Sequence, residues 1–185
     1  RRPMAGPVFL SGDRISLRTV EDDDLDFFHE ATNHPEVRRY INSFDGPVSK
    51  TEYERETFEK HRTEGVSLVV CDGETRVGNV ALGPVNDEHG WANLGAWLHP
   101  DHHGEGYAVA ACARLLDYAF GERGLRRVRA QHLGPNDDSR RLLDRLGFTQ
   151  EGIARDHYRF EGGVVDDVRY GLLADEWPGS EQIVE

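Results

Sequence analysis

Lysine is scarce in this 185-residue chain: only Lys50 and Lys60 occur among 22 basic residues, against 34 acidic ones, for a formal net charge of -12. Nucleic-acid binding needs clustered positive charge to neutralise phosphates, so this class of partner is disfavoured. Two explanations of the acidity stay open and are compatible. One is a solvated acidic surface with arginine in place of lysine, as in proteins from high-salt, high-GC organisms. The other is attraction of a cationic, amine-bearing substrate.

Cysteine and long apolar runs are also scarce. Cys71 and Cys112 are far apart and neither belongs to a Cys-x-x-Cys motif. A metal site or a disulfide framework is therefore disfavoured and a reducing cytoplasm is expected, with a single 71–112 bridge as the alternative. No segment approaches the ~18 apolar residues of a membrane span. No secretion signal is recognised either, so we expect a cytoplasmic protein without membrane contact.

Hydrophobic periodicity predicts a mixed α/β sheet in one domain. We expect strands at 15–20, 67–71, 77–85, 91–98 and 128–133, followed by a closing hairpin of 152–160 and 165–173. We expect helices at 21–32, 35–41, 50–63, 107–122 and 138–146, the third of them polar and exposed. The first strands form a meander, and later strands alternate with helices.

The segment between 98 and 108 is the most informative. Two glycines, Gly104 and Gly106, lie between a strand and a helix, where a backbone bend points successive N–H groups into one small volume. Such a nest at a helix N-terminus can hold a phosphate or pyrophosphate, although a plain tight turn explains the same pattern. The spacing is not that of a Walker loop, and Val109 replaces the third glycine of the dinucleotide fingerprint.

Four segments in order resemble the GNAT superfamily of acyl-CoA-dependent N-acetyltransferases, and within it the branch of ribosomal-protein alanine N-acetyltransferases. These segments are WANLGAWLHPDHHGEGYA, AACARLLDYAFGERGLRRVRAQ, NDDSRRLLDRLGF and EGIARDHYRFEGGVVDDVRYGLLADEW. The resemblance implies a predominantly antiparallel sheet of six to seven strands, flanked by helices and splayed between the family's fourth and fifth strands. Here those strands are 91–98 and 128–133. We expect the domain to span 13–177, with an N-terminal extension at 1–12, partly a cloning remnant, and a tail at 178–185.

The resemblance also implies acetyl-CoA as co-substrate, with no metal. Its pantetheine arm would pair with backbone near Leu98 and His99 in the manner of an added strand. Asn136 would lie near the pantetheine, Ser139 would hydrogen-bond or protonate the leaving thiolate, and the Leu98 N–H would stabilise the oxyanion. The pyrophosphate would lie on the N–H groups of His103, Gly104, Glu105, Gly106, Tyr107 and Ala108.

Two positions depart from the family pattern. Asp101 stands where relatives often have Gln or Arg, and its charge should repel a pyrophosphate unless it points away. Asn93 stands where many relatives carry a glutamate that serves as general base, and an amide cannot take the proton. Asn93 could instead position a water or hold the substrate amide. Glu88 and His89 are substitute bases, and deprotonation through water is the favoured route.

Structural alternatives apply to several of these residues. Ser139 could be a first-turn polar residue and Asn136 a helix cap. His103 and its neighbour His102 have no third metal ligand in view. Trp91 and Trp97 share one strand face, either as core or as a pocket wall. Asp166 and Asp167 are expected at a solvated strand end.

We predict an acyltransferase whose acceptor is the α-amine of a protein N-terminus. One alternative acceptor is a small amine such as a polyamine, an amino acid or an aminoglycoside. The alternative from another class is a catalytically silent acyl-CoA-binding module, which the Asn93 substitution keeps open. Because dimers are common among relatives, a homodimer is one expectation.

Overall fold

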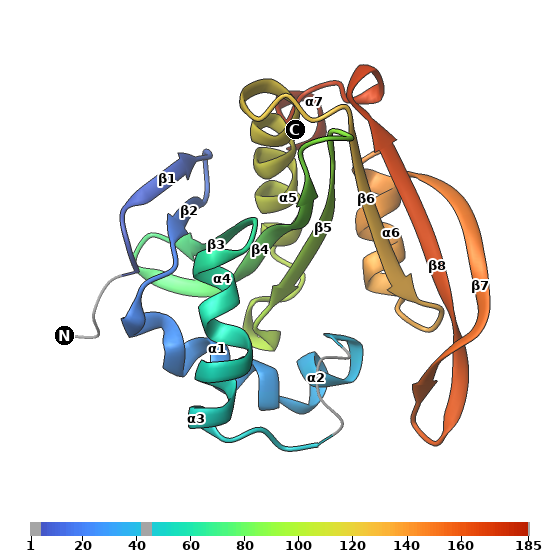
Figure 1. Cartoon of the computed structure of the whole chain (residues 1–185). Coiled ribbons are helices and arrows are strands. Elements are labelled where there is room, and N and C mark those ends of the chain that lie inside the picture. The colour runs from blue at the N-terminus through green and yellow to red at the C-terminus, as the bar shows by residue number, and fades with distance from the viewer. Residues whose placement is uncertain (1–4, 42–45, 185) are drawn as a thin grey trace.

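A single eight-stranded sheet runs through the protein. The computed structural model describes residues 5–41 and 46–184, and the strand order is β1-β2-β3-β4-β5-β6-β8-β7 (Figure 1). All neighbouring pairs are antiparallel except β5 and β6. The strands are β1 (Val8–Ser11), β2 (Ser16–Thr19), β3 (Val66–Asp72), β4 (Thr75–Asn86), β5 (Trp91–Leu98), β6 (Arg127–Leu133), β7 (Thr149–Phe160) and β8 (Gly163–Leu173).

The predicted mixed sheet is confirmed, but it has eight strands rather than six or seven. The additional edge strand is β1, which pairs with β2. It lies within the segment expected to be an extension, of which residues 1–4 are outside the described part of the chain. Three of its four residues are exposed and only Leu10 is buried, which left little periodic signal to find.

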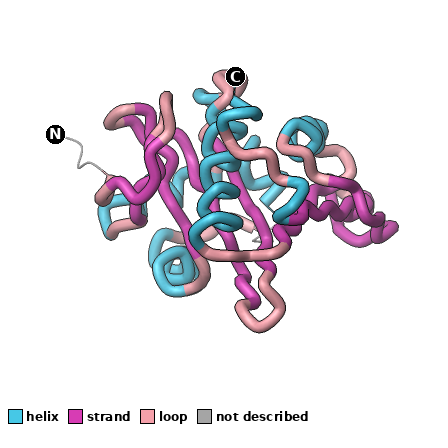
Figure 2. The backbone as a smooth tube through the Cα atoms, turned by 90° about the horizontal axis from the view of Figure 1, so that it is seen from above, coloured by secondary structure: helices cyan, strands magenta, loops and turns pink. Residues whose placement is uncertain are grey.

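Helices cover both faces of the sheet (Figure 2). They are α1 (Leu25–Asn33), α2 (Pro35–Ile41), α3 (Lys50–Tyr53), α4 (Glu59–Thr63), α5 (Tyr107–Asp117), α6 (Asp137–Arg145) and α7 (Glu181–Val184). Short 3₁₀ or π-helical segments are η1 (Asp22–Asp24), η2 (Glu54–Phe58), η3 (Pro100–His102), η4 (Tyr118–Glu122) and η5 (Ala174–Glu176). No helix in these described ranges is both long and apolar enough to cross a membrane.

The segment α3–η2–α4 forms the helix predicted at 50–63, and most of its residues are exposed as expected, but two of its aromatic side chains are buried. Tyr53 is 2% exposed and Phe58 is 1% exposed. Phe58 packs edge-on against Phe28 of α1, with 5.6 Å between ring centroids. Charged residues surround these two aromatics in the sequence and hide the narrow apolar stripe that faces the sheet.

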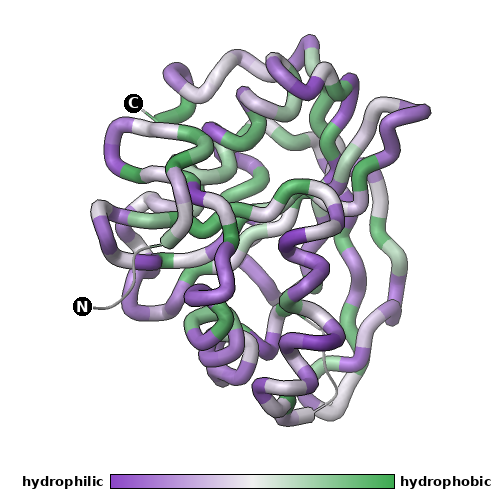
Figure 3. Tube along the Cα trace, turned by 60° about the vertical axis from the view of Figure 1, so that its left-hand side comes forward, coloured by the Kyte–Doolittle hydropathy of each residue, from purple (hydrophilic) through white to green (hydrophobic). Residues whose placement is uncertain are grey.

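Two apolar clusters hold the helices against the two faces of the sheet. The larger one lies between the sheet and α5 with α6, and includes Leu115, Leu116 and Val128. The smaller one lies on the other face, under α1, α3 and η2, and includes Phe28. Figure 3 shows hydrophobic residues interspersed with hydrophilic ones along the strands and helices, as expected for elements that pack one side against a core.

The parallel pair β5–β6 determines where a ligand can enter. Its ladder contains only Trp91 with Arg127, Ala92 with Val128 and Asn93 with Arg129. Beyond Asn93 the two strands separate, as Figure 1 shows. The predicted splay is therefore confirmed.

The C-terminal tail packs back onto η4 and the end of α5. The Trp177 indole N–H donates to Asp117 Oδ1 at 2.9 Å, and the Ser180 backbone N–H donates to the same oxygen at 3.0 Å. The Ser180 hydroxyl donates to the other carboxylate oxygen of Asp117.

Candidate active site

The loop after β5 has the conformation that its glycines suggest. Gly104 and Gly106 have φ values of 82° and 81°, in the left-handed region that residues with a Cβ rarely adopt. Gly106 is also the N-cap of α5, so the loop leads directly into the positive end of that helix. A Cβ at either glycine would meet no atom within 4 Å, so the backbone has open space above it. These features suit the approach of a phosphate group.

Arg14, in the turn between β1 and β2, reaches this loop from the other end of the sequence. Its Nη1 donates to the carbonyl oxygen of Glu105 at 3.2 Å, and its guanidinium lies 5.6 Å from the centroid of the Tyr107 ring. The Tyr107 hydroxyl in turn donates to Asp72 Oδ2 at 2.5 Å, and this bond is the main cause of a raised pKa for Tyr107. Tyr107 is buried and anchors the start of α5.

Asp101 is the acidic residue that departs from the family pattern. Its side chain is 82% exposed and its carboxylate lies 3.6 Å from His99 Nδ1. Because the carboxylate is in solvent, water and salt screen its charge. The cost to phosphate binding is therefore smaller than the sequence alone suggests.

The open edge of β5 supplies unpaired backbone. On the β4 side 91–92 and 94–98 are paired, with a register shift at Asn93, and the His99 N–H donates to the Val77 carbonyl at 2.8 Å. On the β6 side the ladder ends at Asn93, so 94–98 have no strand partner there. The His103 ring lies 3.1 Å from the Leu98 carbonyl oxygen. An extended chain of amides could add to this edge as a further strand.

Asn136 and Ser139 begin helix α6, behind the splayed end of β6. Asn136 is the N-cap, and its Oδ1 accepts the backbone N–H of Ser139 at 3.1 Å. The capping alternative for Asn136 is therefore confirmed. The Ser139 side chain is half-buried, and its hydroxyl has no hydrogen-bond partner among the described residues.

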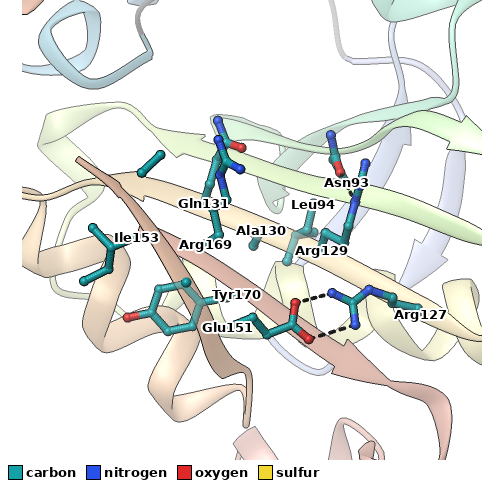
Figure 4. A pocket seen from close by; sticks show the side chains of 12 residues that line it. Asn93, Leu94, Arg127, Arg129, Ala130, Gln131, Glu151, Ile153, Arg169 and Tyr170 are labelled. Carbon is teal, nitrogen blue, oxygen red and sulfur yellow. Dashed lines mark hydrogen bonds and ion pairs between the residues drawn. The ribbon is translucent and has the colours of Figure 1, made fainter. Parts of the chain in front are cut away.

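A groove of about 540 Å³ lies across β5, β6, β8 and β7, next to the point where β5 and β6 separate (Figure 4). Its position beside the splay makes it the candidate acceptor site. The groove is lined by Asn93, Leu94, Arg127, Arg129, Ala130, Gln131, Glu151, Gly152, Ile153, Ala154, Arg169 and Tyr170.

Arg127 and Glu151 form a two-pronged ion pair in the groove (Figure 4). The pair passes over Gly171 of β8, where a Cβ would lie 2.5 Å from Glu151 Oε1 and 2.7 Å from Arg127 Nη2. Glycine at 171 therefore leaves the space that this pair occupies. Hydrogen bonding to Arg127 lowers the pKa of Glu151 and keeps it ionised.

Arg129 and Asn93 are joined by a second hydrogen bond. Arg129 Nε donates to Asn93 Oδ1 at 3.0 Å, and the guanidinium stacks 3.5 Å from the centroid of the Trp91 ring. Trp91 thus supports the groove. Trp97, on the same strand face, packs into the core at 5.4 Å from the Phe28 ring.

The expectation of a solvated strand end at 166–167 was wrong for Asp167. It is 1% exposed, and its Oδ2 accepts Arg169 Nε at 2.8 Å. Its Oδ1 is buried without a partner among the described residues. Asp167 is paired on both sides, with Leu133 of β6 and with Ala154 of β7, which the Asp-Asp sequence does not indicate.

The family of this chain is decided by comparison with known proteins. The family model described as an acetyltransferase (GNAT) domain matches residues 14–149. The chain belongs to the GNAT acetyltransferase family. It is an N-acetyltransferase with the GNAT fold, and the resemblance found in the sequence is confirmed.

Several relatives align over nearly the whole GNAT chain. The putative ribosomal N-acetyltransferase YdaF of Bacillus subtilis is 29% identical over 91% of this chain and 96% of its own length. Spermidine N(1)-acetyltransferase of Escherichia coli K12 is 27% identical over 90% of both chains. The crystal structure of spermidine N-acetyltransferase from Vibrio cholerae in complex with CoA and spermine has a TM-score of 0.81 and 27% identity, over 89% of this chain and 98% of that one.

Two predicted bases of the GNAT site lie away from the groove. Glu88 and His89 are exposed in the turn between β4 and β5. The His89 N–H donates to Asn86 Oδ1 at 2.7 Å, and its carbonyl accepts Arg126 Nε at 2.6 Å. Neither side chain lines the groove, whereas Asn93 does.

Side chains of the metal-ligating types and cysteine thiols can be located in the described ranges. No group of three or more His, Cys, Asp or Glu side chains there could hold a metal ion. Cys71 and Cys112 are free, buried thiols rather than a disulfide. Burial raises the pKa of Cys71 to about 11 and that of Cys112 to about 12, so both are protonated near neutrality.

Sequence reasoning missed the arginines of the site. The signal for the groove was present, because Arg127, Arg129 and Gln131 alternate along β6 and period-two alternation places them on one face. Arg14 gave no such signal, because only the fold brings the β1–β2 turn to the loop after β5.

Proposed function

We propose that this N-acetyltransferase transfers the acetyl group of acetyl-CoA to the α-amine of a protein N-terminus. The observation that carries the proposal is the groove, which is broad, polar and adjacent to the β5–β6 splay. An extended N-terminal segment could lie in it with its amine at the splay. The similarity to a protein named a putative ribosomal N-acetyltransferase supports the same acceptor class.

The residues around the splay fit the co-substrate. The free edge of β5 near Leu98 and His99 would pair with the pantetheine amides. The N–H groups from His103 to Ala108 would hold the pyrophosphate at the start of α5, and Arg14 would add a cation beside them. Asn136 would border the pantetheine.

Acetyl-CoA supplies a thioester, whose carbonyl carbon forms a bond to the amine nitrogen as its bond to sulfur breaks. The Leu98 backbone N–H would donate to the oxygen on which negative charge develops. The Ser139 hydroxyl, free of other partners, would donate to the leaving thiolate. Holding the amine beside the carbonyl supplies much of the rate.

The amine must lose a proton before or during attack. Asn93 lines the groove, and its Oδ1 is occupied by Arg129, so its NH₂ group is the part available to position a water or the acceptor's amide. Glu88 and His89 are solvent-exposed and do not line the groove, which favours a water route over direct transfer to either.

A small cationic amine is the competing acceptor, because relatives of similar identity are named spermidine acetyltransferases. The groove lining disfavours a polycation, since it holds three arginines and one glutamate. A silent acyl-CoA-binding module is disfavoured by the unpartnered Ser139 hydroxyl, which a binding module would not need.

The test begins with calorimetric titration of the purified protein with acetyl-CoA. The loaded protein is then incubated with peptide N-termini, polyamines and aminoglycosides while thiol release is followed. We expect release with peptides. Thiol release only with polyamines or aminoglycosides would show that the acceptor is a small amine. Binding of acetyl-CoA without thiol release on any amine would favour the silent module.

A further inference from the structure

The groove has the opposite charge balance from the rest of the protein. The chain carries 34 acidic and 22 basic residues apart from histidine. The groove lining contains Arg127, Arg129 and Arg169 but only one carboxylate, that of Glu151. A cation-rich hollow on an acidic protein is not explained by surface composition.

Two of the three arginines are already paired. Arg127 is bound by Glu151, and Arg169 Nε donates to the buried Asp167 at 2.8 Å. Arg129 forms no ion pair with any described carboxylate. Arg129 is therefore the cation of the groove whose charge no described carboxylate neutralises, so it can attract an anionic group of a ligand.

Arg129 is also held in a fixed orientation. Its Nε is bound to Asn93 and its plane stacks over Trp91, which leaves both terminal nitrogens available. A guanidinium in this arrangement presents a fork that matches a carboxylate. Its strand neighbour Asn93 is the last β5 residue paired with β6, so the fork lies where the strands begin to separate.

We infer that Arg129 determines acceptor specificity by binding a carboxylate that the acceptor carries close to its reactive amine. This inference rests on the proposed transferase function and narrows its substrate class. The carboxylate could belong to an acidic residue next to a peptide N-terminus or to a free amino acid. Spermidine and other polyamines offer only cations to the same arginines.

The test uses acceptors that differ only in the carboxylate. One pair of peptides has Ala at position one and either Asp or Asn at position two. A second pair is alanine and its amide, which tests the free amino acid as the source. We expect kcat/KM to be about tenfold higher for the carboxylate member of one pair, because charge-assisted, bidentate hydrogen bonds exceed neutral ones.

Variants then assign that preference to Arg129. Arg129→Gln should reduce the ratio of kcat/KM between the carboxylate acceptor and its uncharged counterpart to about one. The Kd for acetyl-CoA should be unchanged. Arg129→Lys keeps the positive charge but lacks the guanidinium fork, so it should retain an intermediate kcat/KM ratio. That result would show that the loss in Arg129→Gln does not come from a general loss of structure. The matched control is Arg145→Gln, an exposed arginine of α6 outside the groove lining, which should keep the full ratio.

Equal kcat/KM within both pairs, an unchanged ratio in Arg129→Gln, or a preference for spermidine would each overturn the inference. In the first two cases turnover of peptides leaves the proposed transferase intact. Absence of thiol release with every acceptor, while acetyl-CoA binds, removes the proposed function and this inference together.

Discussion

The backbone N–H of Ser139, not its hydroxyl, makes the hydrogen bond to Asn136 that caps helix α6. Alanine at 139 keeps that N–H, so we expect Ser139→Ala to leave the free energy of unfolding within about 0.5 kcal/mol of wild type. Loss of the proton donor should lower kcat by about tenfold to a hundredfold. Steady-state kinetics and calorimetry with acetyl-CoA check both expectations.

Asn136→Ala provides the matched control, because it removes the cap and should destabilise the protein by about 1 kcal/mol. Unchanged kcat in Ser139→Ala, with unchanged acetyl-CoA affinity, would remove the hydroxyl from the mechanism.

Arg14 should contribute to acetyl-CoA binding through its charge beside the phosphate loop. We expect Arg14→Ala to raise the Kd for acetyl-CoA by about threefold to tenfold at low salt, since a partly exposed cation–phosphate contact contributes about 1 kcal/mol. The difference from wild type should shrink as salt screens the interaction. Calorimetric titration at two ionic strengths measures it.

Arg123→Ala, which removes an exposed arginine at the opposite end of β5, is the control and should leave this Kd unchanged. An equal Kd for Arg14→Ala and wild type at low salt would place the phosphates away from this turn.

Gly106 combines a φ of 81° with the N-cap position of α5. Gly106→Ala should destabilise the fold by about 1 kcal/mol and weaken acetyl-CoA binding, because alanine avoids this conformation. Gly121→Ala is the matched control: Gly121 lies in η4, does not have positive φ, and has no atom near its Cβ position. We expect that variant to be about as stable as wild type or more so. Equal stability and equal affinity for Gly106→Ala would argue against the loop conformation.

The stability of the protein should fall in mild acid because of His61. Burial lowers the pKa of His61 to about 4 from an ordinary 6.5, and its Nδ1 lies 2.8 Å from Ser67 Oγ. The unfolded chain binds the proton more readily, so the stabilising contribution is full above pH 6.5 and is lost as the pH falls from 6.5 towards 4. The loss reaches at most about 3 kcal/mol.

Chemical denaturation of wild type and His61→Gln across this pH range checks the contribution. The two curves should converge as the pH falls. If the stability-versus-pH curves of the two proteins stay parallel, other groups cause the acid sensitivity.

The backbone of the site could be predicted from the sequence, because it depends on local rules. Glycines at 104 and 106 fixed the loop between β5 and α5, and Asn136 followed by polar residues marked the start of α6. The family resemblance then supplied the splay between β5 and β6, which the short ladder confirms.

The charge of the site could be predicted only in part. Alternation along β6 would have placed Arg127 and Arg129 on one face. It would not have shown that Glu151 pairs with Arg127 and that Arg129 has no partner among the described carboxylates. The contact of Arg14 with the glycine loop and the burial of Asp167 depend on segments distant in the sequence, which no local pattern predicts. The overall charge of -12 was compatible with a solvated acidic surface or with attraction of a cationic substrate, whereas the groove carries the opposite balance.

The most direct measurement of the central claim uses one peptide that contains both a free N-terminus and an internal lysine. The peptide is incubated with acetyl-CoA and the purified protein, and tandem mass spectrometry then locates the acetyl group. We predict acetylation at the α-amine alone. Acetylation at the lysine ε-amine, or an unmodified peptide beside rapidly acetylated spermidine, would contradict the account.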